Sequence, residues 1–167
     1  NPTVLLVLGS RKFESAIQPF LDHKNKVMRL PAAFIDIESL RNYSGVDEPE
    51  KIKRAIAEAA LSKSVRYVML IGDAALFPVR HRYVSNGNEL GRPSDPKSNS
   101  GWWFDGGYNP TDHYYANLFH HQDGGLPGDF DNWDADGDGR YNEQVWQWQG
   151  TGDDQAQNVI TYNPDQV

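Results

Sequence analysis

The stretch Val4-Leu5-Leu6-Val7-Leu8-Gly9 (VLLVLG) decides the fold of this chain. A short, continuous apolar run that ends at a glycine is typical of a β-strand buried on both faces, as in a parallel sheet. Such a strand needs a partner on each edge and apolar cover on each face. The sequence that follows must therefore supply further strands and helices.

Two later segments show the three- and four-residue spacing of apolar side chains that marks one face of a helix. The first runs from Phe13 to Leu21 and the second from Ile52 to Ala60. The second helix also has a start signal in Asp47-Glu48-Pro49. Acidic residues favour the positive end of the helix dipole, and a proline at the first turn loses no helical hydrogen bond.

The remaining apolar segments of this half are predicted to be strands. Lys26–Leu30 and Ala33–Ile37 form a more exposed strand region broken by Pro31, and Val65–Ile71 forms a third strand. The order strand–helix–strand–helix–strand with short links implies parallel strands and right-handed crossovers. We expect an α/β fold, a three-layer βαβαβ parallel sheet in which the strand from Val4 lies between the other two.

Length and composition predict one domain over residues 1–167. Residues 1–79 form the βαβαβ core, and residues 80–158 form a long, loop-rich second half that includes a strand-like piece, His113–Leu118. Residues 159–167 begin a further strand that we expect to be truncated. Long loops usually carry function or need an additional stabilising interaction.

The net charge of −7 is concentrated in one segment. Between Asp129 and Asp154 there are eight acidic residues and one basic residue, Arg140, whereas acidic and basic residues are balanced elsewhere. This distribution favours a cation site over a generally acidic surface. It does not resemble the basic surface of a nucleic-acid-binding protein, so we expect no nucleic acid partner.

The segment DADGDGRYNE, Asp134 to Glu143, is a candidate calcium loop. Carboxylates at alternate positions, with Gly139 allowing a sharp turn, can surround one hard cation, and Ca²⁺ takes six to eight oxygen ligands in flexible geometry. The predicted ligands are the side chains of Asp134, Asp136, Asp138 and Glu143 and the backbone carbonyl of Arg140. An EF-hand loop carries glutamate at its twelfth position, which here is Val145, so the predicted loop is of a non-EF type.

Other familiar motifs are absent from the sequence. The chain has no cysteine, which excludes thiolate catalysis and thiolate metal sites within it. It has no apolar run long enough for a membrane span, no nucleotide-binding fingerprint and no serine-nucleophile motif. His113, His120 and His121, with Asp112, offer ligands for zinc or iron, but their spacing is not a recognised metal pattern and ordinary surface or packing histidines are favoured.

Several segments together resemble the gingipain-type cysteine peptidases of the caspase-like clan. They are VLLVLG, FESAIQPFLDHKN followed by KVMRL, EPEKIKRAIAEAALS, VRYVMLIGDAALFPV, TDHYYANL and WDADGDGRYNE, in that order from Val4 to Glu143. The resemblance implies a caspase-like subdomain, the first of two α/β subdomains in the family's catalytic unit. The catalytic histidine and cysteine of that family lie in the second subdomain, so the resemblance assigns no catalytic residue to this chain.

The resemblance implies the non-catalytic amino-terminal part of a secreted or cell-surface cysteine endopeptidase, inactive alone. Its expected role is a calcium-stabilised scaffold whose partner is the carboxy-terminal catalytic subdomain, with a protein or peptide as the substrate of the full enzyme. The alternative is a calcium-dependent binding module for glycans or surface proteins. All five tryptophans lie between Trp102 and Trp148, and exposed rings stack on sugars, although packing beneath the loops is the favoured explanation.

Overall fold

The computed structural model describes residues 3–84, 107–121, 127–148 and 159–162. The chain divides into two compact units. The first comprises Asn1–Val79 and Asp112–Asp131, and the second comprises Arg80–Thr111 and Asn132–Val167. Among the described residues, no helix is long and apolar enough to cross a membrane.

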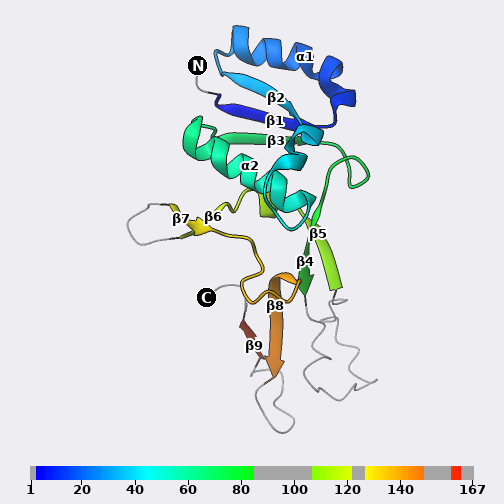
Figure 1. Ribbon diagram of the computed structural model, residues 1–167, viewed down its shortest axis with the longest axis vertical. Coiled ribbons are helices and arrows are strands. Elements are labelled where there is room, and N and C mark those ends of the chain that lie inside the picture. Colours follow the sequence, from blue (N-terminus) through cyan, green and yellow to red (C-terminus); the bar gives the residue numbers. More distant parts are fainter. Residues whose placement is uncertain (1–2, 85–106, 122–126, 149–158, 163–167) are drawn as a thin grey trace. The chain divides into compact units, whose positions relative to one another are not determined.

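The first unit contains a sheet of three parallel strands in the order β2-β1-β3. They are β1 (Leu5–Gly9), β2 (Ala32–Asp36) and β3 (Tyr67–Ile71). Leu5 pairs with Ala32 on one side and with Tyr67 on the other. Figure 1 shows β1 in the middle of the three strands. The sequence therefore predicted the α/β class, the parallel pairing and the strand order correctly.

Helices connect these strands. In chain order they are η1 (Arg11–Phe13), α1 (Glu14–Asp22), η2 (His23–Val27), η3 (Ile37–Asn42) and α2 (Glu48–Ser62). Every residue of β1 is buried. Leu5 and Val7 form an apolar cluster with Leu21 of α1. The burial of β1 explains why its sequence is apolar at every position before the terminal glycine.

α2 begins where the sequence predicted, and its first turn is capped by side chains. The Asp47 carboxylate accepts a hydrogen bond from the N–H of Glu50 (3.0 Å), and the Glu50 carboxylate accepts one from the N–H of Val46 (3.0 Å). Glu50 is buried and its charge is balanced by Arg54, whose Nη2 lies 2.6 Å from Oε1. This reciprocal arrangement satisfies N–H groups that the first turn of a helix leaves without helical partners.

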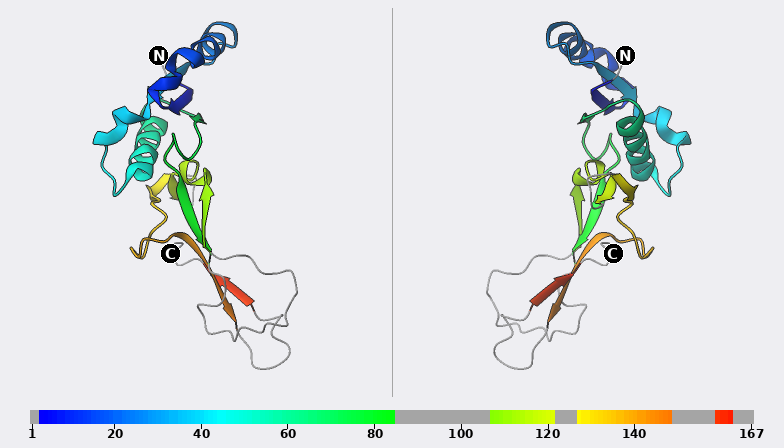
Figure 2. Two further views of the ribbon diagram at one scale, coloured as in Figure 1. Left: turned by 90° about the vertical axis from the view of Figure 1, so that its right-hand side faces the viewer. Right: turned by 90° about the vertical axis from the view of Figure 1, so that its left-hand side faces the viewer.

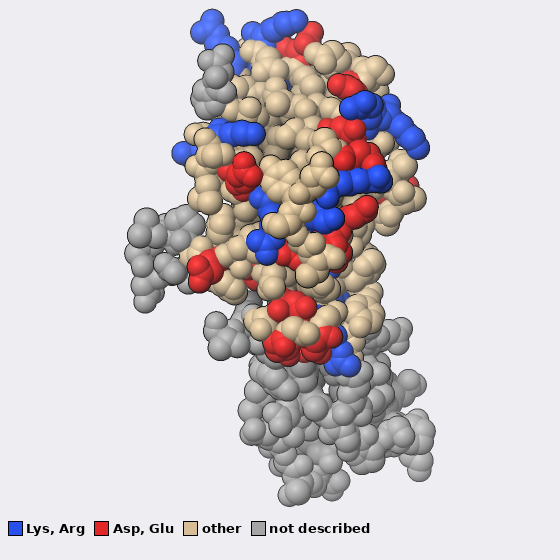
Figure 3. All heavy atoms as spheres, in the orientation of Figure 1, with Lys and Arg blue, Asp and Glu red and all other residues tan. Residues whose placement is uncertain are grey.

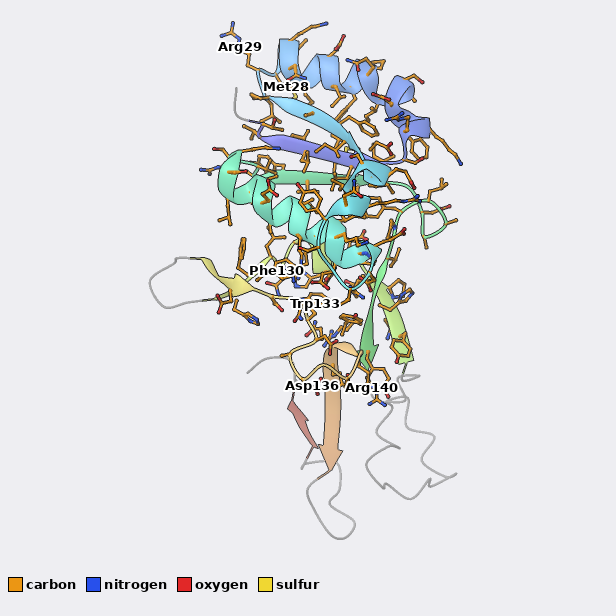
Figure 4. All side chains as sticks on the ribbon, viewed as in Figure 1. Met28, Arg29, Phe130, Trp133, Asp136 and Arg140 are labelled. Carbon is orange, nitrogen blue, oxygen red and sulfur yellow. The ribbon has the colours of Figure 1, made fainter. Side chains whose placement is uncertain are left out.

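The predicted strand Lys26–Leu30 is wrong. The helix continues from α1 into η2, a π-helix that ends at Val27. Lys26 forms an ion pair with Asp22 one turn earlier (2.8 Å), a contact that favours helix. The Asn25 side chain then accepts a hydrogen bond from the N–H of Ala32 (2.9 Å) and ties this turn to the start of β2. Met28, labelled with Arg29 in Figure 4, is exposed rather than packed as a strand residue.

The predicted strand-like piece His113–Leu118 is also wrong, because its first residues form the 3₁₀ helix η5 (His113–Tyr115). Tyr114 and Tyr115 are both buried. The Tyr115 ring packs edge-on against Phe77, and its hydroxyl donates to the Pro78 carbonyl (2.6 Å). In a strand, the neighbouring side chains of Tyr114 and Tyr115 would point to opposite faces of the sheet. In the 3₁₀ helix both rings are buried within the first unit. A short hairpin of β6 (Phe119–His121) and β7 (Pro127–Phe130) follows.

A buried lysine connects α2 to this segment. The ammonium group of Lys53 is fully buried, donates to the Asp131 carbonyl and lies 4.0 Å from the centre of the Tyr114 ring. The Phe130 ring, labelled in Figure 4, lies 5.3 Å from the same group. Aromatic faces and a carbonyl oxygen together replace part of the water that a buried ammonium loses.

The second unit has its own sheet, in the order β5-β4-β8-β9. Its strands are β4 (Arg80–Val84), β5 (Gly107–Thr111), β8 (Tyr141–Trp148) and β9 (Val159–Tyr162). β4 pairs antiparallel with β5 and parallel with β8, and β8 pairs antiparallel with β9. Figure 2 shows these pairs from two further sides. The described part of the predicted loop-rich half thus contains regular strands that its glycine-rich sequence did not indicate.

Replacing Asp47 with alanine should reduce the free energy of unfolding by about 1 kcal/mol, because the N–H of Glu50 loses its acceptor. Asp47→Asn keeps an oxygen acceptor at the cap and should remain near the parent value. Urea denaturation followed by far-UV circular dichroism measures both changes. Equal losses in the two variants would contradict the capping role.

Candidate metal site

The acidic loop lies in the second unit, between Trp133 and the start of β8. Its ends are joined by a hydrogen bond from the N–H of Asn142 to the carbonyl of Trp133 (2.7 Å). Gly137 and Gly139 have φ angles of 77° and 82°. A Cβ atom at either glycine would have nothing within 4 Å, so these positions require glycine for backbone conformation and not for space.

Hydrogen bonds between nearby residues shape the loop from within. The Asp134 carboxylate accepts from the N–H of Gly139 (3.2 Å), and the Asp136 carboxylate accepts from the N–H of Asp138 (3.2 Å). The Asp138 carboxylate accepts from the N–H of Arg140 (2.7 Å). Aspartates commonly fold tight turns by bonding to backbone groups a few residues ahead. These bonds fix the carboxylates in place while leaving further oxygen lone pairs on each group.

The loop brings three of the predicted ligands together. One carboxylate oxygen from each of Asp134, Asp136 and Asp138 lies within 4.8 Å of the other two. With calcium–oxygen distances of about 2.3–2.6 Å, two ligands of one ion lie at most ~5.2 Å apart. A single Ca²⁺ ion can therefore contact all three groups. Figure 3 shows acidic side chains gathered on this face of the molecule.

Glu143 is not a member of this three-carboxylate group. It is buried, and its Oε1 lies 3.3 Å from Nη1 of Arg140. Burial raises the pKa of the Glu143 carboxyl group, and the hydrogen bond from Arg140 opposes that shift. Coordination by Glu143 and by the Arg140 carbonyl stays a prediction. For Glu143 to coordinate, the cation would have to compete with the Arg140 guanidinium group for its carboxylate.

The contacts of the Arg140 side chain were not predicted from the sequence. Its Nε lies 3.7 Å from Asp138, and the guanidinium group lies 4.6 Å from the centre of the Tyr83 ring on β4. Nε of Arg82, also on β4, donates to the carbonyl of Asn142 at the end of the loop (3.2 Å). Figure 4 labels Asp136 and Arg140 near the start of β8. The sequence did offer a signal for these contacts, because Arg140 is the only basic residue between Asp129 and Asp154. A positive side chain inside an acidic segment offsets the repulsion between its carboxylates.

The histidines do not form a second metal site among the described residues. His113 is exposed, and Nε2 of His120 lies 3.9 Å from Oδ1 of Asp131. Asp131 instead accepts a hydrogen bond from the amide of Asn117 (2.7 Å). The side chain of His121 lies outside the described residues. Within the described part of the chain, the aspartate loop is the group with the proximity that a metal requires.

Comparison with known families gives the class to which this fold and site belong. The sequence model of Peptidase family C25 matches residues 1–145, which include the parallel sheet and the whole acidic loop. The chain belongs to Peptidase family C25, the gingipain family of cysteine peptidases. Searches of curated proteins and of solved structures gave no match.

Removing calcium with a chelator should lower the melting temperature of the chain. An ion that binds only the folded loop stabilises it by mass action, by ~2.7 kcal/mol at one hundred times its dissociation constant. Asp136→Ala should melt like the chelator-treated parent and gain little from added calcium. Differential scanning calorimetry with and without calcium measures both effects.

Asp129→Ala is the matched control, because Asp129 is exposed, lies in the same acidic segment and is not a member of the three-carboxylate group. This variant should keep the full response to calcium. An equal loss in Asp129→Ala and Asp136→Ala would show that net charge, not a bound ion, sets the stability.

Proposed function

We propose that this chain is the non-catalytic amino-terminal part of a secreted or cell-surface gingipain-like cysteine endopeptidase. It acts as a calcium-stabilised scaffold for a carboxy-terminal catalytic subdomain. The observation that carries this proposal is the family match over residues 1–145 in a sequence that contains no cysteine. A cysteine peptidase requires a thiolate nucleophile and a base to activate it. On this proposal, the thiolate comes from residues outside this chain.

The parallel sheet supports the structural half of the proposal. Leu5 and Val7 of β1 pack with α1, while Ile56 and Ala60 of α2 line a cavity with Val68 and Leu70 of β3. Successive residues of a strand face opposite sides of a sheet. Val68 and Leu70 pair with Leu6 and Leu8, so they face the side opposite to Leu5 and Val7. We infer a three-layer, caspase-like subdomain in which each helix covers one face of the strands.

The acidic loop supports the calcium half. Asp136 and Asp138 are exposed, so an ion here would keep access to water. Magnesium prefers a tighter octahedral shell with more water, and calcium tolerates irregular carboxylate and carbonyl ligands. An exposed loop of three carboxylates suits the affinities of roughly 10⁻⁴–10⁻³ M of extracellular calcium modules.

A glycan-binding module is less well supported. Trp133 is 3% exposed and packs inside its unit, so it offers no ring face to a sugar. Trp102 and Trp103 lie outside the described residues, as do the side chains of Trp146 and Trp148 in β8. Trp133 thus fits the packing explanation given by the sequence.

The purified chain should not hydrolyse peptide bonds, because it lacks a thiol nucleophile. A mixture of fluorogenic peptides, assayed with calcium and a thiol reductant, measures this. In the full enzyme that we propose, a second α/β unit should supply a His-Gly pair and a later cysteine, and alkylating that cysteine should abolish activity. Hydrolysis by the isolated chain that survives repurification and resists thiol reagents would overturn the proposal.

A further inference from the structure

Two turns meet at the amino-terminal ends of the three parallel strands. One turn precedes β2 and the other precedes β3, and the register of the sheet places both beside the start of β1. The Pro31 carbonyl accepts a hydrogen bond from the N–H of Val4 (2.8 Å), and the Val4 carbonyl accepts one from the N–H of Arg66 (3.0 Å). The two turns are therefore about two strand spacings, or roughly 10 Å, apart.

These turns concentrate positive charge. Residues 23–35 and 59–72, which contain them, hold five of the sixteen Lys and Arg residues of the chain and none of its twenty-three Asp and Glu residues. Together these five form the basic edge: Lys24, Lys26, Arg29, Lys63 and Arg66. Lys24 is half-buried and the other four are exposed. Asp22 offsets the charge of Lys26. Figure 3 shows Lys and Arg atoms at the corner where Figure 4 labels Arg29, so a chain of net charge −7 presents a positive surface here.

Two apolar side chains project from the first of these turns. Val27 is 68% exposed and Met28 is 53% exposed. Hydrogen bonds hold the turn in place, because the N–H of Met28 donates to the His23 carbonyl (3.1 Å) and the N–H of Leu30 donates to the Lys24 carbonyl (2.9 Å). The exposed pair thus belongs to an ordered turn, with two lysines of the basic edge before it and an arginine after it.

A surface of this composition fits an anionic lipid layer. Each Lys or Arg near such a layer increases affinity about fivefold by attracting its phosphate groups. Apolar side chains beside the cations enter the boundary between head groups and acyl chains, and their burial adds affinity that salt does not screen. A soluble polyanion satisfies the cations but offers no apolar layer to Val27 and Met28. The charge and the apolar pair together therefore favour lipid as the partner.

We propose that the basic edge, together with Val27 and Met28, is a docking surface for a membrane that contains anionic phospholipid. The cations contact the phosphate groups, and the two apolar side chains enter the head-group region. The contact is peripheral and reversible, because it relies on two turns and no anchor. It concerns the first unit alone, and it does not depend on the calcium loop or on peptidase function.

Co-sedimentation with lipid vesicles tests this proposal. The vesicles contain equal parts of phosphatidylglycerol and phosphatidylcholine, and a chelator is present so that calcium cannot bridge the acidic loop to the lipid. The parent chain should bind these vesicles at about 0.05 M salt and at least about tenfold more weakly at about 0.5 M salt, because ions screen the charges. It should not bind vesicles of phosphatidylcholine alone. Equal binding to both kinds of vesicle, or binding to neither, would overturn the proposal.

A pair of charge variants locates the surface. Arg29→Asn/Lys63→Asn neutralises one cation in each turn, and asparagine tolerates the φ angle of 51° at position 29. This variant should bind the anionic vesicles at least about tenfold more weakly. The matched control is Lys12→Asn/Arg41→Asn, which removes the same charge from η1 and η3, at the opposite ends of the strands. The control should bind like the parent, and an equal loss in both variants would show that overall charge sets binding.

A second pair of variants separates lipid from a soluble polyanion. Val27→Ser/Met28→Ser should weaken vesicle binding at least about tenfold, because the apolar contribution is lost. Val46→Ser is the control, since Val46 is 79% exposed and lies before the start of α2. It should bind like the parent. Unchanged vesicle binding by Val27→Ser/Met28→Ser, or binding of polyglutamate as tightly as the vesicles, would identify an acidic polymer as the partner and overturn the proposal.

Discussion

Burial of β1 on both faces and both edges is the constraint on which the first unit depends. Val7 and Leu8 have no exposed surface, so the strand is stable only with β2 and β3 beside it and helices over it. The parallel direction of those partners requires crossover connections, which α1 and α2 provide. Among the described strands, β2 and β3 each pair with β1 alone.

In the second unit, repulsion between carboxylates is the constraint on the acidic loop. Asp134, Asp136 and Asp138 are held together by backbone donors and by glycines that permit positive φ angles. Arg140 supplies internal positive charge beside Asp138 and Glu143. A calcium ion and this guanidinium group would thus act on the same carboxylates. The affinity of the loop for calcium should reflect that competition. Glu143 could coordinate the ion only after its ion pair with Arg140 is broken.

The sequence predicted those parts of the structure that depend on burial pattern and local chemistry. The continuous apolar run predicted β1, the acidic residues and proline after Asp47 predicted the start of α2, and the alternate carboxylates predicted the proximity of the three aspartates. Lys26–Leu30 and His113–Leu118 were assigned wrongly because alternation over five or six residues does not distinguish a strand from a turn with long-range contacts. The interaction between Arg140 and Tyr83 depends on pairing of β4 with β8, which no local pattern encodes.

The central claim is that the acidic loop of this family C25 chain holds one calcium ion as part of a scaffold. Isothermal titration calorimetry, with calcium added to the chelator-treated chain, tests this claim most directly. The account predicts saturable binding of one ion per chain, with magnesium binding much more weakly at the same concentrations. Titration without saturable heat, or equal binding of both metals, would contradict a calcium site and reduce the loop to a solvated turn neutralised by Arg140.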